Sequence, residues 1–308
     1  MDSDYIIILC GHFNDNYVPL TRSEFWKLYH QCGDSVKGIV ESEDEKVKKL
    51  LDRSGSVAFG IETLKEMGIR IRTFLDEEFP ERLYSKLKDF CPPLLYMCGE
   101  SNLLKQKYVG YVGSRNINES DVTWTQKMVQ KNLYDNFGIV SGGAKGIDSI
   151  SITYSLNNGG FVIAFLPDNM KNWIQDKFYR DFVMNGRLLL CSHVSPFAPK
   201  TKNSFVSAAM ERNKLIYAQS NATVVVKSDY NKGGTWAGAT EALRHKWVPV
   251  FVWDNKKYEG NKSLIEKGGI PLSDDGEKGI ATIKKETKDC SSEQKQMTIF
   301  DLTDGKNN

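Results

Sequence analysis

The chain has 308 residues, of which 40% are hydrophobic and 26% are charged, and its formal net charge is +2. This length allows one large domain with additions or two domains, and the composition excludes a wholly disordered chain. Because the chain is nearly neutral, a nucleic-acid surface can only be a local patch.

Cysteine and histidine usage argues against a metal site and against a disulfide scaffold. Six cysteines and four histidines are scattered along the chain, and no Cys-x-x-Cys pair occurs. We therefore expect reduced thiols, no metal and no cofactor, in a cytoplasmic protein. Asp2 and Asp4 precede only a short apolar run, Ile6–Cys10, which differs from a signal peptide, and no segment approaches a membrane span.

Residues 1–74 read as a separate helical domain. Phe25, Trp26, Leu28 and Tyr29 fall on one side of a helix that Ser23 starts, and a second helical stripe contains Val47, Leu50 and Leu51. A small packing domain is the favoured interpretation. A helical DNA-binding element is the alternative, although no basic recognition helix is present.

Residues 75–272 are expected to form the main domain, and residues 273–308 a polar tail. Pro80 and Pro92 stop the helices of a connector, after which apolar runs alternate with helical patterns. The expected strands are 94–97, 108–112, 137–140, 161–166, 187–191, 222–226 and 249–253, and the expected helices are 119–134, 147–157, 172–184, 203–218 and 236–245. This alternation predicts an α/β domain with a Rossmann-like, mostly parallel sheet and helices on both faces.

Two loops after successive strands predict an anion site. Gly113, Ser114 and Arg115 follow the strand 108–112, and the run Ser141–Asp148, with Gly142, Gly143, Lys145 and Gly146, follows the next strand. Free backbone N–H groups at helix N-termini attract anions, and ligands of such sheets bind at the carboxyl ends of the strands. The alternative is a pair of tight turns without a ligand, but the two cations favour an anion.

Three further features refine this interpretation. Asp148 is expected to be structural, as a cap or as a support for Lys145. Arg212 and Lys214 lie on a helix before the strand 222–226, and Gly233, Gly234 and Thr235 follow that strand and add backbone donors at the same edge. Neither the dinucleotide-binding G-x-G-x-x-G pattern nor a phosphate-binding loop with its lysine is complete here.

These residues resemble the DNA-processing protein A family (DprA, also called Smf). The resemblance covers roughly residues 75–253, and no counterpart of the winged-helix extension of many members is present. It rests on these segments: Val112-Gly113-Ser114-Arg115, Ser141-Gly142-Gly143-Ala144-Lys145-Gly146-Ile147-Asp148, Arg212-Asn213-Lys214, Gly234-Thr235, and Pro92-Pro93-Leu94-Leu95-Tyr96 upstream.

The resemblance implies a non-catalytic protein that binds single-stranded DNA, usually as a homodimer, and helps to load a RecA-type recombinase during transformation. Arg115, Lys145, Arg212, Lys214 and the loop glycines would then hold the DNA backbone, which fits sequence-independent, salt-sensitive binding. Trp236 is either a base-stacking residue or part of the core.

The alternative is an enzyme or a sensor that uses the same anion site. The chain also resembles the LOG-type nucleotide phosphoribohydrolases, which carry a glutamate three residues after the threonine of their Gly-Thr pair. Here Gly238 occupies that position and Glu241 lies six residues after Thr235, so hydrolysis is disfavoured. A sensor that binds a nucleotide signal without turning it over stays open.

The tail contains an apolar island that resembles the peptide by which bacterial proteins bind the sliding clamp. Gln296, Met297, Ile299 and Phe300 carry the match. A short apolar anchor on a polar tether suits docking into a partner's groove. The alternative is that the island packs back onto the domain.

Overall fold

A computed structural model describes residues 1–167, 170–198, 201–275 and 280–281 of the chain. Its centre is one nine-stranded sheet with the order β1-β2-β6-β5-β4-β3-β7-β8-β9. The strands are β1 Arg70–Thr73, β2 Leu94–Cys98, β3 Tyr108–Val112, β4 Gly138–Ser141, β5 Val162–Leu166, β6 Leu188–Ser192, β7 Ala222–Val225, β8 Val250–Trp253 and β9 Ile270–Leu272. The predicted Rossmann-like, mostly parallel sheet is confirmed, since only the β1–β2 and β2–β6 pairs are antiparallel.

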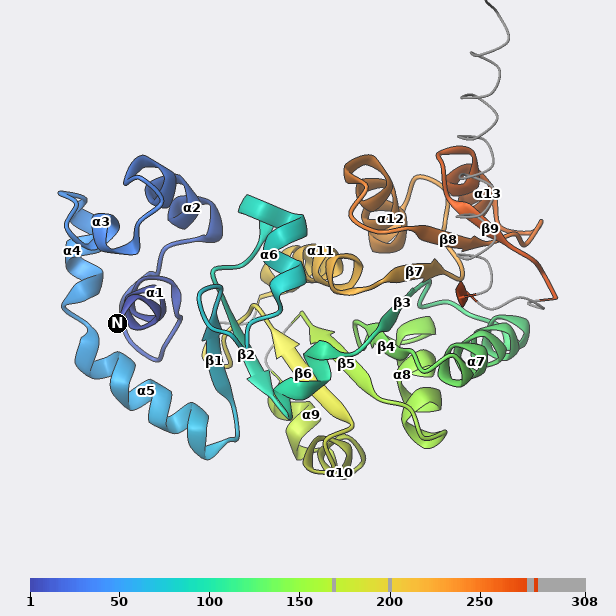
Figure 1. The fold of residues 1–308 in the computed structure, drawn as a ribbon, viewed down its shortest axis with the longest axis horizontal. Helices are drawn as coiled ribbons and strands as arrows, with labels where there is room; N and C mark the ends of the chain where they lie inside the picture. Colours follow the sequence, from blue (N-terminus) through green and yellow to red (C-terminus); the bar gives the residue numbers. More distant parts are fainter. Residues whose placement is uncertain (168–169, 199–200, 276–279, 282–308) are drawn as a thin grey trace, which may run out of the picture.

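Helices cover both faces of this sheet, with α6, α11 and α12 above it and α8, α9 and α10 below it in Figure 1. The helices of the α/β part are α6 Glu81–Leu87, η1 Lys88–Phe90, η2 Ser101–Lys105, α7 Glu119–Tyr134, α8 Ile147–Asn157, α9 Lys171–Gln175, α10 Lys177–Met184, α11 Lys202–Gln219, α12 Gly233–His245 and α13 Glu259–Glu266. Every residue of the strands β2 to β8 is buried, which explains their continuous apolar sequences.

The order of the strands creates a switch point beside β3. From β3 the chain moves through β4 and β5 to β6, and it then returns to place β7 on the other side of β3. Loops that leave two neighbouring strands toward opposite sides of a sheet open a crevice at the carboxyl ends of those strands. The crevice is therefore expected between the loops after β3 and β7.

The N-terminal part consists of helices that pack against the β1 side of the sheet (Figure 1). They are α1 Asp2–Cys10, α2 Arg22–Gln31, α3 Val36–Val40, α4 Glu45–Leu51 and α5 Ser54–Glu66. The α2 helix begins at Arg22 because Thr21 and Glu24 form a capping box. Trp26 joins this part to the α/β part, since its Nε1 donates to the carbonyl of Cys91 at 2.7 Å and its ring stacks on Tyr84.

Three details differ from the sequence-based expectation. The strand β1 lies before residue 75, so a strand of the sheet falls within the range 1–74 that was expected to be helical. The edge strand β9 was not predicted, because it is three residues long and contains Pro271, which only an edge strand tolerates. The helix expected at 172–184 is two helices, because Asp176 takes an extended conformation and caps α10.

A histidine bridge between α2 and η1 gives a pH-dependent contribution to stability. The ring of His30 bonds to Asp89 through Nε2 at 3.0 Å and to Asp34 through Nδ1 at 2.6 Å. Hydrogen bonds to Asp89 and then to Asp34 raise the pKa of His30. A raised folded-state pKa gives stabilisation that is complete below the unfolded value of about 6.5 and is lost as the pH rises through the folded value.

We therefore expect His30→Gln to lower the free energy of unfolding at mildly acidic pH and to have a smaller effect at alkaline pH. Denaturant unfolding of both proteins between about pH 5.5 and pH 8.5 measures the difference. A difference that stays constant or grows as the pH rises would contradict the bridge.

Candidate functional site

The loops after β3, β4 and β7 pack directly against one another at the carboxyl edge of the sheet. The amide of Ser114 donates to the carbonyl of Lys227 at 2.9 Å, and the amide of Ile147 donates to the carbonyl of Ser114 at 3.4 Å. Gly146 has φ +88°, and a Cβ there would lie 2.4 Å from the Ser114 carbonyl oxygen. Glycine is therefore required at this position by both the backbone conformation and the close approach of the two loops.

These loops and α11 enclose a cleft of about 1030 Å³. One wall contains Gly113, Ser114 and Arg115, and another contains Gly233, Gly234 and Thr235, the first turn of α12. The third wall is α11, which contributes Phe205, Val206, Ala209, Met210, Arg212, Asn213 and Tyr217. The cleft lies at the switch point beside β3, as the strand order requires.

A buried ion pair holds the floor of this cleft. Arg212 is only 3% exposed, its Nη1 lies 3.6 Å from Oδ2 of Asp148, and it donates to the carbonyl of Phe165 at 3.2 Å. A Cβ at Gly142 would lie 1.3 Å from the same Nη1, so glycine there makes room for the guanidinium. The pair thus ties α11 to the β4 loop and to the start of α8.

The surroundings of Asp148 shift the pKa of its carboxyl in two opposing directions. Burial raises its pKa, whereas Arg212 and the backbone N–H groups of Ala144 and Gly142 act to lower it. The net direction is upward because desolvation of the carboxylate is the larger effect. Asp148 is therefore a structural residue, and its ionic partner is Arg212 rather than the expected Lys145.

Two helix N-termini that meet the cleft lack a side-chain cap. The N-cap of α8 is Gly146, and the side chain of Lys232 makes no cap hydrogen bond at the start of α12. By contrast, Asn118 caps α7 and Thr201 caps α11. At α8 the amides of Ile147 and Ser149 already donate to the carbonyls of Ser114 and Ala144, so the uncapped first turn of α12 is the one that offers backbone N–H groups to an anion.

Comparison with known proteins identifies the family. The protein-family model described as DNA recombination-mediator protein A matches residues 70–281 of this chain.

The chain belongs to this family.

The DNA processing protein DprA of Streptococcus pneumoniae (strain ATCC BAA-255 / R6) is 31% identical over 201 residues, which cover 64% of this chain and 68% of that protein. The crystal structure of DprA from Streptococcus pneumoniae matches with a TM-score of 0.66 and 21% identity, over 88% of this chain and 94% of that one. A structure reported for the single-stranded DNA binding mode of DprA from Helicobacter pylori matches with a TM-score of 0.52 and 24% identity, over 66% and 90% of the two chains. At these identities the two structures establish a shared fold.

Membership of the family agrees with the loop arrangement, because the residues that carried the resemblance lie together. Gly113, Ser114, Arg115, Gly233, Gly234 and Thr235 all line the cleft. Gly142, Gly143 and Gly146 shape the β4 loop, where Gly143 packs under Trp173. Lys145 is exposed in this loop, next to Ala144, which lines the cleft.

Two cations expected to contact phosphate are placed differently. Arg212 is buried in its ion pair, so it supports the loops from below. Lys214 does not line the cleft, because residues two apart on a helix point in nearly opposite directions. Its Nζ pairs with Glu211 at 3.0 Å and with Glu241 at 3.4 Å, and it is 12% exposed.

The site residues predicted from the sequence did not include several residues of the cleft. Lys232 is exposed beside the glycines of α12, and Lys227 lines the cleft while its Nζ lies 3.3 Å from Oδ2 of the fully buried Asp121. Phe205, Val206 and Met210 are exposed apolar side chains on α11. A group of exposed large apolar side chains is unusual and marks a binding surface, and only the structure reveals this exposure.

Other predictions concern the tail peptide, metal binding and membrane spans. Gln296, Met297, Ile299 and Phe300 of the predicted clamp-binding peptide lie outside the described residues. Within the described ranges no group of three or more His, Cys, Asp or Glu side chains is arranged to hold a metal ion. No helix within those ranges is long and apolar enough to cross a membrane.

The structural role of Arg212 predicts a large loss of stability on its removal. Arg212→Ala leaves the Asp148 carboxylate buried without its ionic partner, and we expect the free energy of unfolding to fall by about 3–5 kcal/mol. Arg115→Ala, at an exposed position, should change it by no more than about 0.5 kcal/mol. Denaturant titration of the three proteins measures both values, and a cost for Arg212→Ala similar to that of Arg115→Ala would refute the supporting role.

Proposed function

We propose that the cleft binds single-stranded DNA as part of a DNA-processing protein that does not act as a catalyst. The observation that carries this proposal is the combination of exposed cations and the uncapped N-terminus of α12 on two walls with an exposed apolar surface on the third. Phosphates require the first kind of surface and bases favour the second. A strand of nucleic acid supplies both groups along one molecule.

The phosphate side of the proposal rests on Arg115 and Lys232. Both side chains are exposed, and neither forms an ion pair with any residue in the described ranges. Lys145 adds a third exposed cation in the adjoining loop. Contacts from such cations and from backbone N–H groups give binding that does not depend on base sequence and weakens with salt.

The base side of the proposal rests on α11 and the loop after β7. Phe205, Val206 and Met210 are 40%, 53% and 50% exposed, although each lines the cleft. Tyr230 is 60% exposed and packs edge-on against Trp236, with ring centroids 5.3 Å apart. Trp236 itself is largely buried, so it supports Tyr230 and leaves Tyr230 as the ring that a base can stack on.

The cleft favours a polymer over a single nucleotide and favours binding over hydrolysis. Its volume of about 1030 Å³ lies at the upper end of the range for sites that enclose one small ligand. Glu241, the acid nearest in sequence to the position that a LOG-type hydrolase needs, lies outside the cleft and pairs with Lys214. The carboxylates that line the cleft are Asp148, which pairs with Arg212, and Asp229.

We also propose the partners and context that the family resemblance implies. These are a homodimer, loading of a RecA-type recombinase during transformation, a sliding clamp bound by the tail, and a cytoplasmic location. The division into 1–74, 75–272 and 273–308 is a proposal of the same standing. Each of these stays a prediction. A reconstituted strand-exchange reaction with a RecA-type recombinase tests the predicted loading of the recombinase.

The phosphate contacts predict a salt-sensitive interaction that depends on Arg115 and Lys145. We expect a labelled single-stranded oligonucleotide to bind the wild type with an affinity that falls with salt. Arg115→Ala combined with Lys145→Ala should weaken binding and reduce the slope of log affinity against log salt by about 1.4, or about 0.7 for each lost phosphate contact. Fluorescence anisotropy across a salt series measures both.

A matched control for this variant is Lys48→Ala combined with Lys65→Ala, which removes the same charge from exposed positions on α4 and α5. Mononucleotides serve as competitors. If the variant at Arg115 and Lys145 binds the oligonucleotide as well as the variant at Lys48 and Lys65 does, DNA binding in the cleft is contradicted. Ready displacement of the oligonucleotide by a mononucleotide would contradict it too, and would favour a nucleotide-signal sensor.

The exposed ring of Tyr230 predicts a loss of affinity that salt does not change. We expect Tyr230→Ala to weaken oligonucleotide binding by about 1–3 kcal/mol through the loss of one stacked base, with the salt slope retained. Phe59→Ala is the control, because Phe59 is an exposed aromatic residue on α5. If Tyr230→Ala and Phe59→Ala bind equally well, Tyr230 is not a stacking residue.

A further inference from the structure

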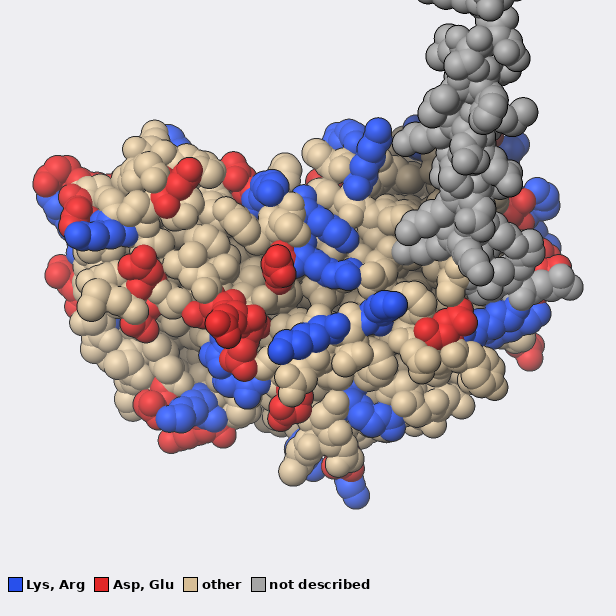
Figure 2. Space-filling model, in the orientation of Figure 1, with Lys and Arg blue, Asp and Glu red and all other residues tan. Residues whose placement is uncertain are grey.

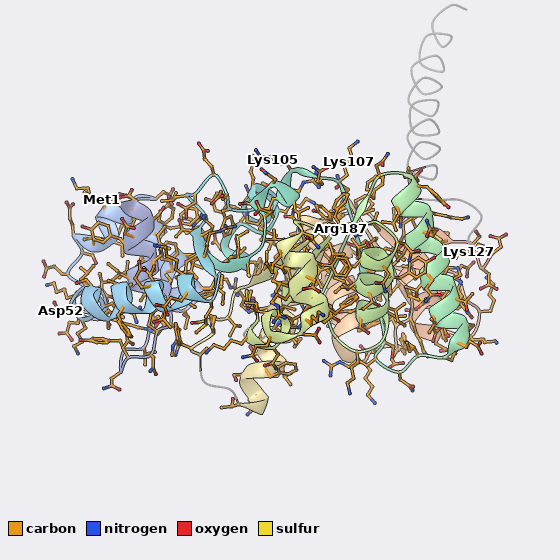
Figure 3. The ribbon with its side chains drawn as sticks, turned by 90° about the horizontal axis from the view of Figure 1, so that it is seen from below. Met1, Asp52, Lys105, Lys107, Lys127 and Arg187 are labelled. Atoms are coloured by element: carbon orange, nitrogen blue, oxygen red, sulfur yellow. The ribbon has the colours of Figure 1, made fainter. Side chains whose placement is uncertain are left out.

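A second cavity, of about 410 Å³, lies where the N-terminal part meets the α/β part. Its walls come from the start of α2, the segment before β2, the residue after β6 and α11. It therefore lies at the carboxyl edge of the parallel strands, the edge at which the first turns of α11 protrude in Figure 3, opposite Lys107. Sites for one small molecule measure about 300–1,000 Å³, so the cavity can hold a ligand of that class.

The helix α11 separates this cavity from the cleft. Ser207, Glu211 and Leu215 line the cavity, and because they are spaced four residues apart they lie along one flank of the helix. Val206 and Met210, which line the cleft, each precede one of these residues and lie along another flank. The two hollows are therefore distinct, and about one helix diameter, or roughly 10 Å, separates them.

The ring of His193 gives the cavity a hydrogen-bonding group that the protein itself does not use. Its Nδ1 is buried, and no residue in the described part of the chain bonds to either ring nitrogen. Burial lowers the pKa of His193 to about 4, against the opposing effect of Glu211, so the ring is neutral at physiological pH. A neutral imidazole offers one donor and one acceptor to a ligand.

The charged groups of the cavity neutralise one another. Nη2 of Arg22 lies 3.3 Å from Oε2 of Glu211, and Nη1 of Arg22 donates to the carbonyl of Asp89 at 2.7 Å. The N-terminal part carries acidic as well as basic side chains on the face that Figure 2 shows, so it is not a cationic surface. Because burying an ionised ligand without an opposite charge is costly, an uncharged ligand fits this cavity better than a phosphate does.

The other walls are apolar and rigid. Pro92 and Pro93 are buried, and their rings have little freedom to move. Phe90 is held by two cations, since the guanidinium of Arg22 lies 5.3 Å and the ammonium of Lys214 lies 5.0 Å from the centre of its ring. Such walls suit a flat molecule with apolar faces and a polar edge, and a nucleobase has this form.

We propose that this cavity holds one uncharged nucleobase, which bonds to the ring of His193 and packs its faces against the apolar walls. This inference rests on the proposed DNA function and adds to it a site for a base on the far flank of α11. Proteins that take a base out of a strand bind it in this way, through hydrogen bonds to its edge and apolar contacts to its faces. The base belongs either to the bound strand or to a free nucleoside, and the chemistry is the same for both.

Two variants test the cavity. His193→Phe removes both ring nitrogens and keeps a ring of similar size, and since those nitrogens have no partner among the described residues we expect no loss of stability. Ser207→Trp fills the cavity from an exposed position, so it carries the test if His193→Phe does not fold. Asn203→Trp is the matched control, because Asn203 is exposed on the same helix and is not among the residues that line the cavity or the cleft.

The probes are radiolabelled deoxynucleosides in equilibrium dialysis and a labelled oligonucleotide of about 20 nucleotides in anisotropy. We expect His193→Phe to weaken binding about tenfold and Ser207→Trp to weaken it at least as much, with Asn203→Trp unchanged. The salt slope should stay the same, because a base carries no charge. A loss with the oligonucleotide assigns the base to the strand, and a loss with a nucleoside alone assigns it to a free nucleoside. If neither probe distinguishes the two variants from Asn203→Trp, the cavity does not hold a base.

Failure of the base cavity and failure of the cleft give different results. If the cleft proposal is wrong, Arg115→Ala combined with Lys145→Ala leaves binding of the oligonucleotide unchanged. If only the base cavity is wrong, that variant loses the oligonucleotide, while His193→Phe and Ser207→Trp bind every probe as Asn203→Trp does.

Discussion

The buried pair of Arg212 and Asp148 is the interaction on which the site depends. It joins α11 to the β4 loop and to the start of α8, and it occupies the space that a side chain at Gly142 would need. A charge pair in this position is expensive to desolvate, so its value lies in fixing one arrangement of the loops more than in net stability. With the floor fixed from below, the cations above it remain exposed at the surface of the cleft.

Strand order explains why cations from distant parts of the sequence meet. The loop after β3 and the loop after β7 are neighbours because β7 lies beside β3, although more than a hundred residues of chain separate the two strands. The same topology gathers the residues before β3, β6 and β7 at the opposite edge. Because the net charge of the chain is only +2, the cations that meet at the cleft form a local patch. The local charge of a surface, rather than the total charge of the chain, determines whether that surface attracts nucleic acid.

How much could be predicted from the sequence depended on the kind of signal. The bounds of β3, α7 and α8 were predicted to the residue, because a buried parallel strand is apolar throughout and glycines and caps mark the helix ends. The strands β1 and β9 were missed because short edge strands carry polar residues or proline. The opposite orientations of Arg212 and Lys214 follow from helical geometry and could have been predicted from their spacing. The exposure of Phe205 and Met210 could not have been predicted, because apolar residues on a helix usually face the core.

The most direct test of the account is to locate the DNA on the protein. An oligonucleotide with a photoreactive base, cross-linked to the wild-type chain and digested, identifies the contacting peptides by mass spectrometry. The account predicts cross-links in the segment 203–217 of α11, which carries apolar side chains that line the cleft, or in the segment 228–236, which carries the exposed ring of Tyr230 beside the cleft residues Asp229 and Asn231. Cross-links confined to the helices α1 to α5, with none in either segment, would show that DNA binds elsewhere and would contradict the cleft.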